Sequence, residues 1–583
     1  MYDLIIRNGT IVDGSGEPSF EGEVAVQDGV IVAVERGGRI EGEAREEIDA
    51  SGCAVTPGFV DIHTHYDGQV TWDPYLTPSS WHGVTTAVFG NCGVGFAPVR
   101  PDQHDYLIQL MEGVEDIPGT ALSAGIRWGW ESFPEFMDAV EQVPLAIDVG
   151  AQVPHGSVRT YVMGERGAKN EPATPEDIEQ MAAIVKEGIE AGALGFSTSR
   201  TLLHKAVDGE PVPGTFAAED ELFGIGRVLG ELGKGIFELA GAGAGGEDIL
   251  GPKKEMEWMR RLSAEIHRPV SFAMLQVDAA PQLWRELLEL SSEAVAEGAE
   301  IFPQIAGRPF GMLVGFQTEY HPFADKAAYQ EIVELPLAER IVELRKPERR
   351  KAILEEKVEY DDPMAAFVYS SLNKLFPMGE PPNYEPSEDE SVAAMAERAG
   401  VAADEMLYDM MLQHDGRELL LFPILNYSEF SCDPIYEMIH HPRAALGLGD
   451  GGAHCGIICD ASIPTFMLTH WVRDRTRGKR IPVEFAVKRM TRDTADLYGL
   501  HDRGTIAVGM KGDVNVIDLD ALQLKLPEMV FDLPNDARRL VQRAEGYRAT
   551  VVSGQVVMRD GEPTGAHPGQ LIRGEQPAPA PVA

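Results

Sequence analysis

Hydrophobic and polar positions divide the chain into two ends built of short strands and a middle in which strands alternate with helices. From Leu4 to about Val55, short apolar runs are separated by dipeptides such as Asn8-Gly9 and Asp28-Gly29, which are typical of hairpin turns. Similar runs return near the C-terminus, over residues 506–509, 513–518 and 550–554. We therefore expect the two ends to pair into one small β-sandwich.

The middle of the chain follows a strand-helix repeat. Residues 174–177 (Thr-Pro-Glu-Asp) form a capped helix start, helical apolar spacing continues to Gly192, and residues 193–197 then form a buried strand. Further strand candidates end near residues 63, 89, 149, 239, 273, 303 and 448. Eight strands separated by helices predict an α/β fold of the (β/α)8, TIM-like barrel type, in which chemistry sits at the C-terminal strand ends.

These patterns give approximate domain boundaries. A stretch of helical, charged sequence is too long for a simple connection, so we expect a helical insertion that caps the barrel mouth. The final residues carry Pro577, Pro579 and Pro581 and are expected to be disordered. The predicted segments are 1–56 and 501–573 for the β-sandwich, 57–320 and 417–500 for the barrel, 321–416 for the insertion and 574–583 for the tail.

Composition narrows the classes of function. The 583 residues are 44% hydrophobic, which suits a folded protein with a large core. With 50 Lys+Arg against 93 Asp+Glu, the formal charge of -43 argues against binding to nucleic acid or anionic membranes. The N-terminus has no long apolar segment, and five scattered cysteines are no disulfide framework. We therefore expect a cytoplasmic protein that does not span a membrane.

The most specific chemical feature is the pair His63 and His65, which closes the apolar run 59–62. On a strand, side chains at i and i+2 point to one side, so both imidazoles face the same way. Two neutral imidazoles at a strand end form a metal-binding pair. The alternative is that one histidine belongs to the core and the other faces solvent.

Two further residues lie at predicted strand ends. Cys92, between Asn91 and Gly93, follows a β-branched strand, where a thiolate can bind a borderline-soft metal. Asp450 follows the last barrel strand among glycines, which let a substrate approach closely. Taken alone, Cys92 is more often a small buried hydrophobe and Asp450 a turn residue.

Taken together, these motifs resemble the amidohydrolase superfamily, and within it the N-acyl-D-amino-acid deacylase (D-aminoacylase) branch. The resemblance covers nearly the whole chain and is weakest in the insertion. The stretches that carry it are Asp61-Ile62-His63-Thr64-His65, Gly83-Val84-Thr85-Thr86, Gly90-Asn91-Cys92-Gly93, Pro154-His155-Gly156, Gly195-Phe196-Ser197-Thr198, Phe302-Pro303-Gln304-Ile305, His441-Pro442-Arg443 and Gly504-Thr505-Ile506.

The resemblance implies roles for single residues. It implies that His63 and His65 are zinc ligands, that Cys92 is a thiolate ligand, and that Asp450 touches the metal and acts as the catalytic base. It also implies that His155 faces the substrate, although a histidine that stabilises its own loop is an equal alternative. Barrels of this family are commonly homo-oligomers, so the same state is expected here.

The sequence differs from the branch at the positions whose histidines hold zinc most tightly in that branch. The branch has histidines at the ends of the fifth and sixth strands, whereas this chain has Ala240 or Leu239 at the first position and Met274 at the second. Glu238 lies on the fifth strand and is a candidate metal ligand or a partner of one, with a salt-bridge residue as an equal alternative. Residues 197–199 contain no lysine that could bridge two metals. The sequence therefore predicts one or two Zn²⁺ ions.

The expected substrate is a small amide or N-acyl amino acid. D-aminoacylases place a lysine after the sixth-strand histidine to hold the substrate carboxylate, and Gln276 stands there in this chain. Arg308 and Arg200 are candidate replacements, with structural ion pairs as the alternative. His454 is a candidate cavity-lining residue. The stretches 310–316 and 128–130 suggest an apolar, aromatic pocket wall.

Three functions follow from these observations. The first is a metal-dependent amidohydrolase that cleaves a non-peptide C–N bond of an N-acyl amino acid or related amide. The second is a hydrolase of a lactone, carbamate or cyclic amide on the same fold. The third is a catalytically weakened barrel that serves as a binding or assembly subunit.

Overall fold

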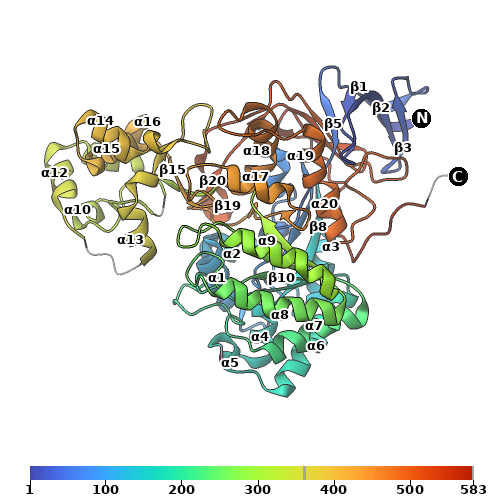
Figure 1. Ribbon diagram of the computed structural model, residues 1–583, viewed down its shortest axis with the longest axis horizontal. Helices are drawn as coiled ribbons and strands as arrows, with labels where there is room; N and C mark the ends of the chain where they lie inside the picture. The colour runs from blue at the N-terminus through green and yellow to red at the C-terminus, as the bar shows by residue number, and fades with distance from the viewer. Residues whose placement is uncertain (319, 359–362, 581–583) are drawn as a thin grey trace.

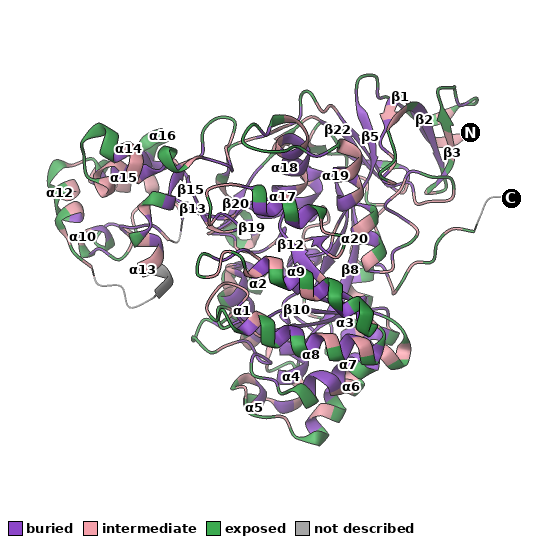
Figure 2. Cartoon of the chain, viewed as in Figure 1, coloured by how far each residue is buried: buried purple, intermediate pink, exposed green. Residues whose placement is uncertain are grey.

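The computed structural model describes residues 1–318, 320–358 and 363–580, and it shows a central barrel with a β-domain on one side and a helical lobe on the other (Figure 1). The barrel strands are buried, and the helices that surround them are exposed on their outer faces (Figure 2). None of the helices in the described ranges combines the length and the hydropathy needed to cross a membrane.

Eight parallel strands form the barrel, as the alternation of strands and helices predicts. Their order is β16-β12-β11-β10-β9-β8-β7-β6. A parallel bridge between Thr64, which follows β6, and Gly451, which follows β16, joins the two edge strands. The strands are β6 (Phe59–Asp61), β7 (Val84–Phe89), β8 (Asp148–Pro154), β9 (Gly195–Ser199), β10 (Ile236–Ala240), β11 (Val270–Ala273), β12 (Ile301–Ile305) and β16 (Ala445–Leu446).

Helices connect these strands and cover the outside of the barrel. Helix α6 begins as predicted, because Thr174 and Asp177 cap each other's backbone and Pro175 occupies the first turn. The connecting helices are α1 (His104–Glu115), α2 (Gly119–Gly125), α3 (Phe133–Glu141), α4 (His155–Met163), α5 (Glu165–Ala168), α6 (Pro175–Glu190), α7 (Glu219–Leu232), α8 (Gly251–Ile266), α9 (Leu283–Ala294), α17 (Asp433–His440), α18 (Ile463–Phe466), α19 (Val483–Met490) and α20 (Arg492–Leu497).

The two chain ends pair as predicted, and they form one nine-stranded sheet. Strand β5 joins them, because it pairs with β1 from one end and with β17 from the other. Apolar side chains of both ends share one buried core. The strands are β1 (Tyr2–Ile11), β2 (Phe20–Gln27), β3 (Val30–Arg36), β4 (Ala44–Asp49), β5 (Ala54–Pro57), β17 (Val514–Ile517), β22 (Tyr547–Val552), β23 (Gln555–Arg559) and β24 (Glu562–Pro563).

The insertion between β12 and β16 has a core of its own and begins before the predicted residue 321. A three-stranded sheet, β13 (Phe310–Val314), β15 (Leu420–Leu425) and β14 (Phe376–Pro377), lies between the barrel and the helical lobe (Figure 1). The helices are α10 (Ala327–Gln330), α11 (Leu337–Leu344), α12 (Pro347–Glu355), α13 (Pro363–Ser370), α14 (Val392–Ala399), α15 (Ala403–Met411) and α16 (Gln413–Gly416). The lobe thus extends sideways, and the sheet faces the barrel mouth.

Two C-terminal features complete the chain. A hairpin of β19 (Glu528–Leu533) and β20 (Ala537–Val541) reaches back over the barrel. In contrast to the disorder predicted from Gly574, the backbone of Gln576 forms hydrogen bonds with Gly499 and His501, each 2.9 Å long. Burial of Leu571 and Ile572 anchors the segment just before it. Residues 581–583 of the predicted tail lie outside the described residues.

Candidate metal centre

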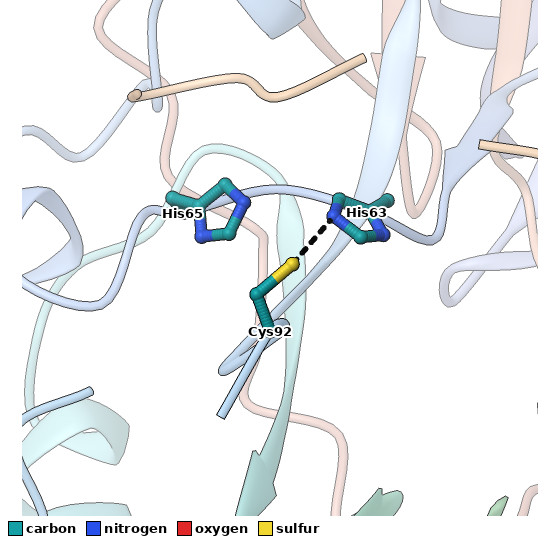
Figure 3. A group of neighbouring side chains, drawn as sticks. All are labelled: His63, His65 and Cys92. Atoms are coloured by element: carbon teal, nitrogen blue, oxygen red, sulfur yellow. Dashed lines mark hydrogen bonds between the residues drawn. The ribbon is translucent and has the colours of Figure 1, made fainter. Parts of the chain in front are cut away.

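His63, His65 and Cys92 meet at the C-terminal end of the barrel, with side chains that point toward one another (Figure 3). His63 and His65 follow β6, Cys92 follows β7, and Asp450 follows β16. The carboxyl ends of parallel strands lie at one edge of a barrel, so residues that are distant in sequence converge there.

The donor atoms of these four residues lie close together. The Nε2 atom of His63 is 3.4 Å from Cys92 Sγ and 3.4 Å from Asp450 Oδ1. The Nε2 atom of His65 is 3.6 Å from the same Asp450 oxygen. Ligand atoms of the two histidines and Cys92 all lie within 4.8 Å of one another. Two nitrogens and one sulfur therefore form one cluster, and a carboxylate oxygen of Asp450 lies against both nitrogens.

Backbone contacts hold the loops of the candidate ligands together. The N–H of Asp450 donates to the carbonyl of His63 (3.1 Å), and the N–H of His65 donates to the carbonyl of Gly451 (2.8 Å). Asn91 Nδ2 donates to the carbonyl of Thr64, which ties the loop of Cys92 to the two histidines. These bonds fix the ligands relative to one another.

Cys92 and Asp450 have left-handed backbone conformations, with φ of 55° and 45°. Such conformations are costly for residues with a side chain and gather at functional sites. Next to Cys92, Gly93 has φ of 71°, and a Cβ there would lie 2.8 Å from the backbone nitrogen of Ser199. Glycine is thus required for the loop to turn its cysteine toward the barrel axis.

Electrostatics keep both imidazoles neutral. Burial lowers the pKa of His63 to about 4 and that of His65 to about 3, so each ring has a lone pair for a cation at neutral pH. Burial raises the pKa of the Cys92 thiol well above its usual value, and nearby Glu238 and Glu115 raise it further. A bound cation favours the thiolate, because the thiolate is the form that binds metals.

Glu115, which the sequence analysis missed, is a fifth ionisable group of the centre. Its Oε1 atom lies 3.3 Å from His65 Nδ1, and its Oε2 atom lies 3.6 Å from His454 Nε2. Burial raises the pKa of Glu115 well above its usual value. A sequence signal exists, since Glu115 falls on the apolar face of α1 with Met111 and Val114, where a carboxylate is out of place.

Two polar residues from barrel strands lie beside the ligands. Gln304, on β12, accepts a hydrogen bond of 2.7 Å at Oε1 from His63 Nδ1. Glu238, on β10, accepts one of 3.0 Å at Oε2 from the N–H of Cys92, while its Oε1 atom lies 3.9 Å from His63 Nδ1. Burial raises the pKa of Glu238 to about 8, and Asp450 adds to this shift.

The centre opens into a cavity of about 940 Å³. Where the sequence analysis placed Met274 at the site, the structure places Ala273 and Leu275 on the cavity wall, together with Ala240 from the fifth strand. These three side chains carry no donor atom. The cavity is also lined by His454 and by His204, a residue that the sequence analysis did not single out.

The structure places the other predicted substrate-binding residues outside the cavity wall. His155 is bound to Thr198 and Glu221, and Gln276 is bound to Asn426, Ser428 and the carbonyl of Pro281. Arg200 pairs with Glu255 (2.8 Å) and Arg308 pairs with Asp460 (2.6 Å). These four side chains stabilise the fold in this structure.

The predicted aromatic wall is formed only in part. Phe310 and Met312 of β13 line the cavity, and Ile424 and Leu425 of β15 join them from the neighbouring strand. Trp128 and Trp130 instead pack with Phe96 and Phe136 in the main core. The sheet of the insertion, rather than the tryptophans, thus supplies one apolar wall of the cavity.

Comparison with known proteins gives the family. The Amidohydrolase family matches residues 46–558, which include both the barrel and much of the β-domain. The chain belongs to the amidohydrolase family. The predicted enzyme class, a hydrolase of carbon–nitrogen bonds other than peptide bonds, is therefore confirmed.

This amidohydrolase is similar to D-aminoacylase of Alcaligenes xylosoxydans xylosoxydans, with 26% identity over 98% of this chain and 97% of that relative. Over 34% of this chain and 36% of the relative, it is 34% identical to N-acyl-D-aspartate deacylase of the same organism. These matches confirm the predicted resemblance to the D-aminoacylase branch.

Two solved structures share the fold. A crystal structure of D-aminoacylase has a TM-score of 0.64 and 22% identity, and covers 99% of this chain and 100% of that chain. N-acyl-D-glutamate deacylase from Bordetella bronchiseptica, solved with zinc and a phosphonate inhibitor, has a TM-score of 0.63 and 22% identity, with 98% and 99% covered. Another structure of D-aminoacylase concerns a binuclear metal centre in that protein.

Proposed function

We propose that this amidohydrolase cleaves the amide bond of a small molecule with one divalent ion, zinc, held by His63, His65, Cys92 and Asp450. The observation that carries the proposal is the convergence of His63, His65 and Cys92 at the barrel mouth, with Asp450 against both histidines. This convergence favours an enzyme over a catalytically weakened binding subunit, because a barrel that catalyses no reaction would not need these donor residues in one place.

The spacing of the donors suits zinc. Zn–N and Zn–O bonds of about 2.0–2.2 Å and Zn–S bonds of about 2.3 Å place tetrahedral donor atoms roughly 3.3–3.6 Å apart. Three of the separations, His63–Cys92 and His63–Asp450 at 3.4 Å and His65–Asp450 at 3.6 Å, agree with this range, and the histidine and Cys92 atoms all lie within 4.8 Å of one another. One thiolate and one carboxylate would also balance the double charge of the ion.

When bound, the ion supplies a Lewis acid that lowers the pKa of water toward about 7 and polarises a carbonyl group. Asp450 is placed to take a proton at its other carboxylate oxygen, Oδ2, and later to pass it to the leaving amine. Its position between His63 and His65 and its left-handed backbone direct this carboxylate into the cavity.

Three further residues hold the ligands in place. Gln304 accepts the Nδ1–H of His63, and Glu115 faces the Nδ1 atom of His65, so each Nε2 lone pair is directed toward the ion. Glu238 fixes the Cys92 loop through the backbone N–H. Glu238 does not line the cavity, which favours the role of a ligand partner over that of a direct ligand.

One ion is proposed rather than two. The fifth- and sixth-strand ends contribute Ala240, Ala273 and Leu275 to the cavity, and these side chains cannot bind a second metal. The binuclear centre named for D-aminoacylase would therefore be reduced to one site in this chain.

The test is metal content together with turnover. Protein purified without chelators is expected to hold about one divalent ion per chain, and His63→Ala, His65→Ala and Asp450→Asn are each expected to reduce that content sharply. His155→Ala serves as the matched control, since His155 is buried outside the cavity. Wild-type protein that neither contains nor takes up a divalent ion, or that cleaves no N-acyl compound when loaded, would contradict the proposal.

A further inference from the structure

The cavity beyond the metal centre is lined mainly by apolar side chains. On the barrel side these are Ala240, Ala273 and Leu275, and on the side of the insertion they are Phe310, Met312, Ile424 and Leu425. Leu203 and Val207, which are 46% and 60% exposed, continue this surface toward the opening. With about 940 Å³, the cavity is at the upper end of the range for small-molecule sites.

The charged residues of the cavity wall do not favour an anionic substrate. Glu112, Glu115, Asp116 and Asp450 face the cavity, and Arg538 is the one lysine or arginine among the described residues that line it. Asp450 and Cys92 neutralise the ion, and Arg538 offsets one of Glu112 and Asp116, so one carboxylate and no positive charge are left over even when the buried Glu115 is left out of the count. A free carboxylate on the substrate would meet like charges.

The other two arginines, which were candidates for binding a substrate carboxylate, have ion-pair partners outside the cavity. Arg200 pairs with Glu255 and donates to the carbonyl of Ala217, and Arg308 is buried against Asp460. At the end of β11, the side chain that faces the cavity is Leu275, an apolar residue. A substrate group that reaches this part of the wall is therefore buried against hydrocarbon.

We propose that the substrate is an amide with a large apolar group and no free carboxylate, such as the N-acyl derivative of an uncharged amine or amino alcohol. This inference rests on the proposed function and names the substrate class of the same site. Burial of the apolar group against Leu275, Met312 and Ile424 supplies binding energy, and the missing cation disfavours N-acyl amino acids.

The experiment compares ligands that differ only in the charged group. The zinc-loaded protein is tested with N-octanoyl-phenylalanine and N-octanoyl-phenylalaninol, each as both enantiomers. Replacement of the carboxylate by the alcohol is expected to raise kcat/KM by about tenfold or more, the size expected when like charges are avoided. Equal or higher kcat/KM for the carboxylate would overturn the inference.

Binding separates this inference from the proposed function. Calorimetry of the same two ligands needs no turnover, so tighter binding of the alcohol without any cleavage would uphold the preference of the cavity for uncharged ligands and contradict the proposed cleavage of such amides. Tighter binding of the carboxylate would refute the substrate class whatever the turnover.

A variant of Leu275 tests whether the preference for the uncharged ligand arises at the apolar wall of the cavity. Leu275→Lys adds a cation at the apolar wall and is expected to shift the preference toward the carboxylate by about tenfold. Leu275→Met is the matched control with similar length and no charge. An unchanged preference in folded, zinc-containing Leu275→Lys protein would contradict the placement of the substrate against Leu275.

Discussion

Glu115→Gln tests whether a carboxylate outside the set of ligands tunes the metal centre. Glu115 Oε1 lies 3.3 Å from His65 Nδ1, both side chains are 2% exposed, and among the described residues neither atom has a hydrogen-bond partner, so the two are placed to bond to each other when a metal fixes the imidazole. A bound cation favours the charged form of the nearby Glu115 carboxyl, and a hydrogen bond to a charged group contributes about 1.5–3 kcal/mol, whereas one to a neutral amide contributes about 0.5–1.5 kcal/mol. The difference of roughly 1–2 kcal/mol corresponds to zinc binding that is about 5- to 30-fold weaker.

The assay is competition with a chelator of known zinc affinity, which reports the Kd of zinc directly. Glu112→Gln is the matched control, because Glu112 lies on the same helix and lines the same cavity but instead accepts the N–H of Gly119 (2.9 Å). Equal zinc affinity in Glu115→Gln and wild type would refute the reasoning. So would an equal loss in Glu112→Gln, since general charge in the cavity would then explain the effect.

Three further predictions concern stability and the metal. Zinc at 100 times its Kd should stabilise the fold by about 2.7 kcal/mol, so thermal scans should show a higher Tm with zinc in wild type and no rise in Cys92→Ser. Arg308→Met should cost about 3–5 kcal/mol by leaving Asp460 unpaired, while zinc affinity in the folded protein stays unchanged. Burial opposes ionisation of Glu221, but hydrogen bonds with His155 and Arg159 outweigh it and lower the pKa of Glu221 to about 2. Stability from this carboxylate, on the order of 3 kcal/mol, is present above about pH 4.5 and is lost as the pH falls toward 2, so Glu221→Gln should flatten acid unfolding curves in that window.

The barrel could be predicted from sequence because its signals are local. Apolar strands, capped helices such as the one that begins after Thr174, and turn dipeptides each specify their own element, and the order of elements leaves few topologies. The sheet of the insertion was not predicted. Strand β14 has two residues and pairs with β15, more than forty residues later in the chain, so no local sequence pattern predicts this pairing.

The site residues that could be predicted are those that belong to sequence motifs at strand ends. His63, His65, Cys92 and Asp450 stand at strand ends, and the structure brings them together. On the sixth strand, Met274 was expected to face the site, but its neighbours Ala273 and Leu275 line the cavity. A shift of one residue along a strand exchanges the two faces of that strand.

Residues with long-range partners were harder to predict than those at strand ends. Arg308 and Arg200 were considered for substrate binding, but their partners Asp460 and Glu255 come from distant segments. Glu115 approaches His65 from a helix fifty residues further along the chain, and only its place on an apolar helix face could have indicated it. Contacts of this kind depend on the assembled fold.

The most direct test of the metal centre is the absorption spectrum of cobalt-substituted protein. A thiolate bound to Co²⁺ gives a charge-transfer band that a serine hydroxyl does not, and Cys92 is the thiol within the ligand cluster at the barrel mouth. We predict the band in wild type and in Cys432→Ser, a buried cysteine of another cluster, and its loss in Cys92→Ser. A wild-type protein without the band, or a band that persists in Cys92→Ser, would contradict the proposed centre.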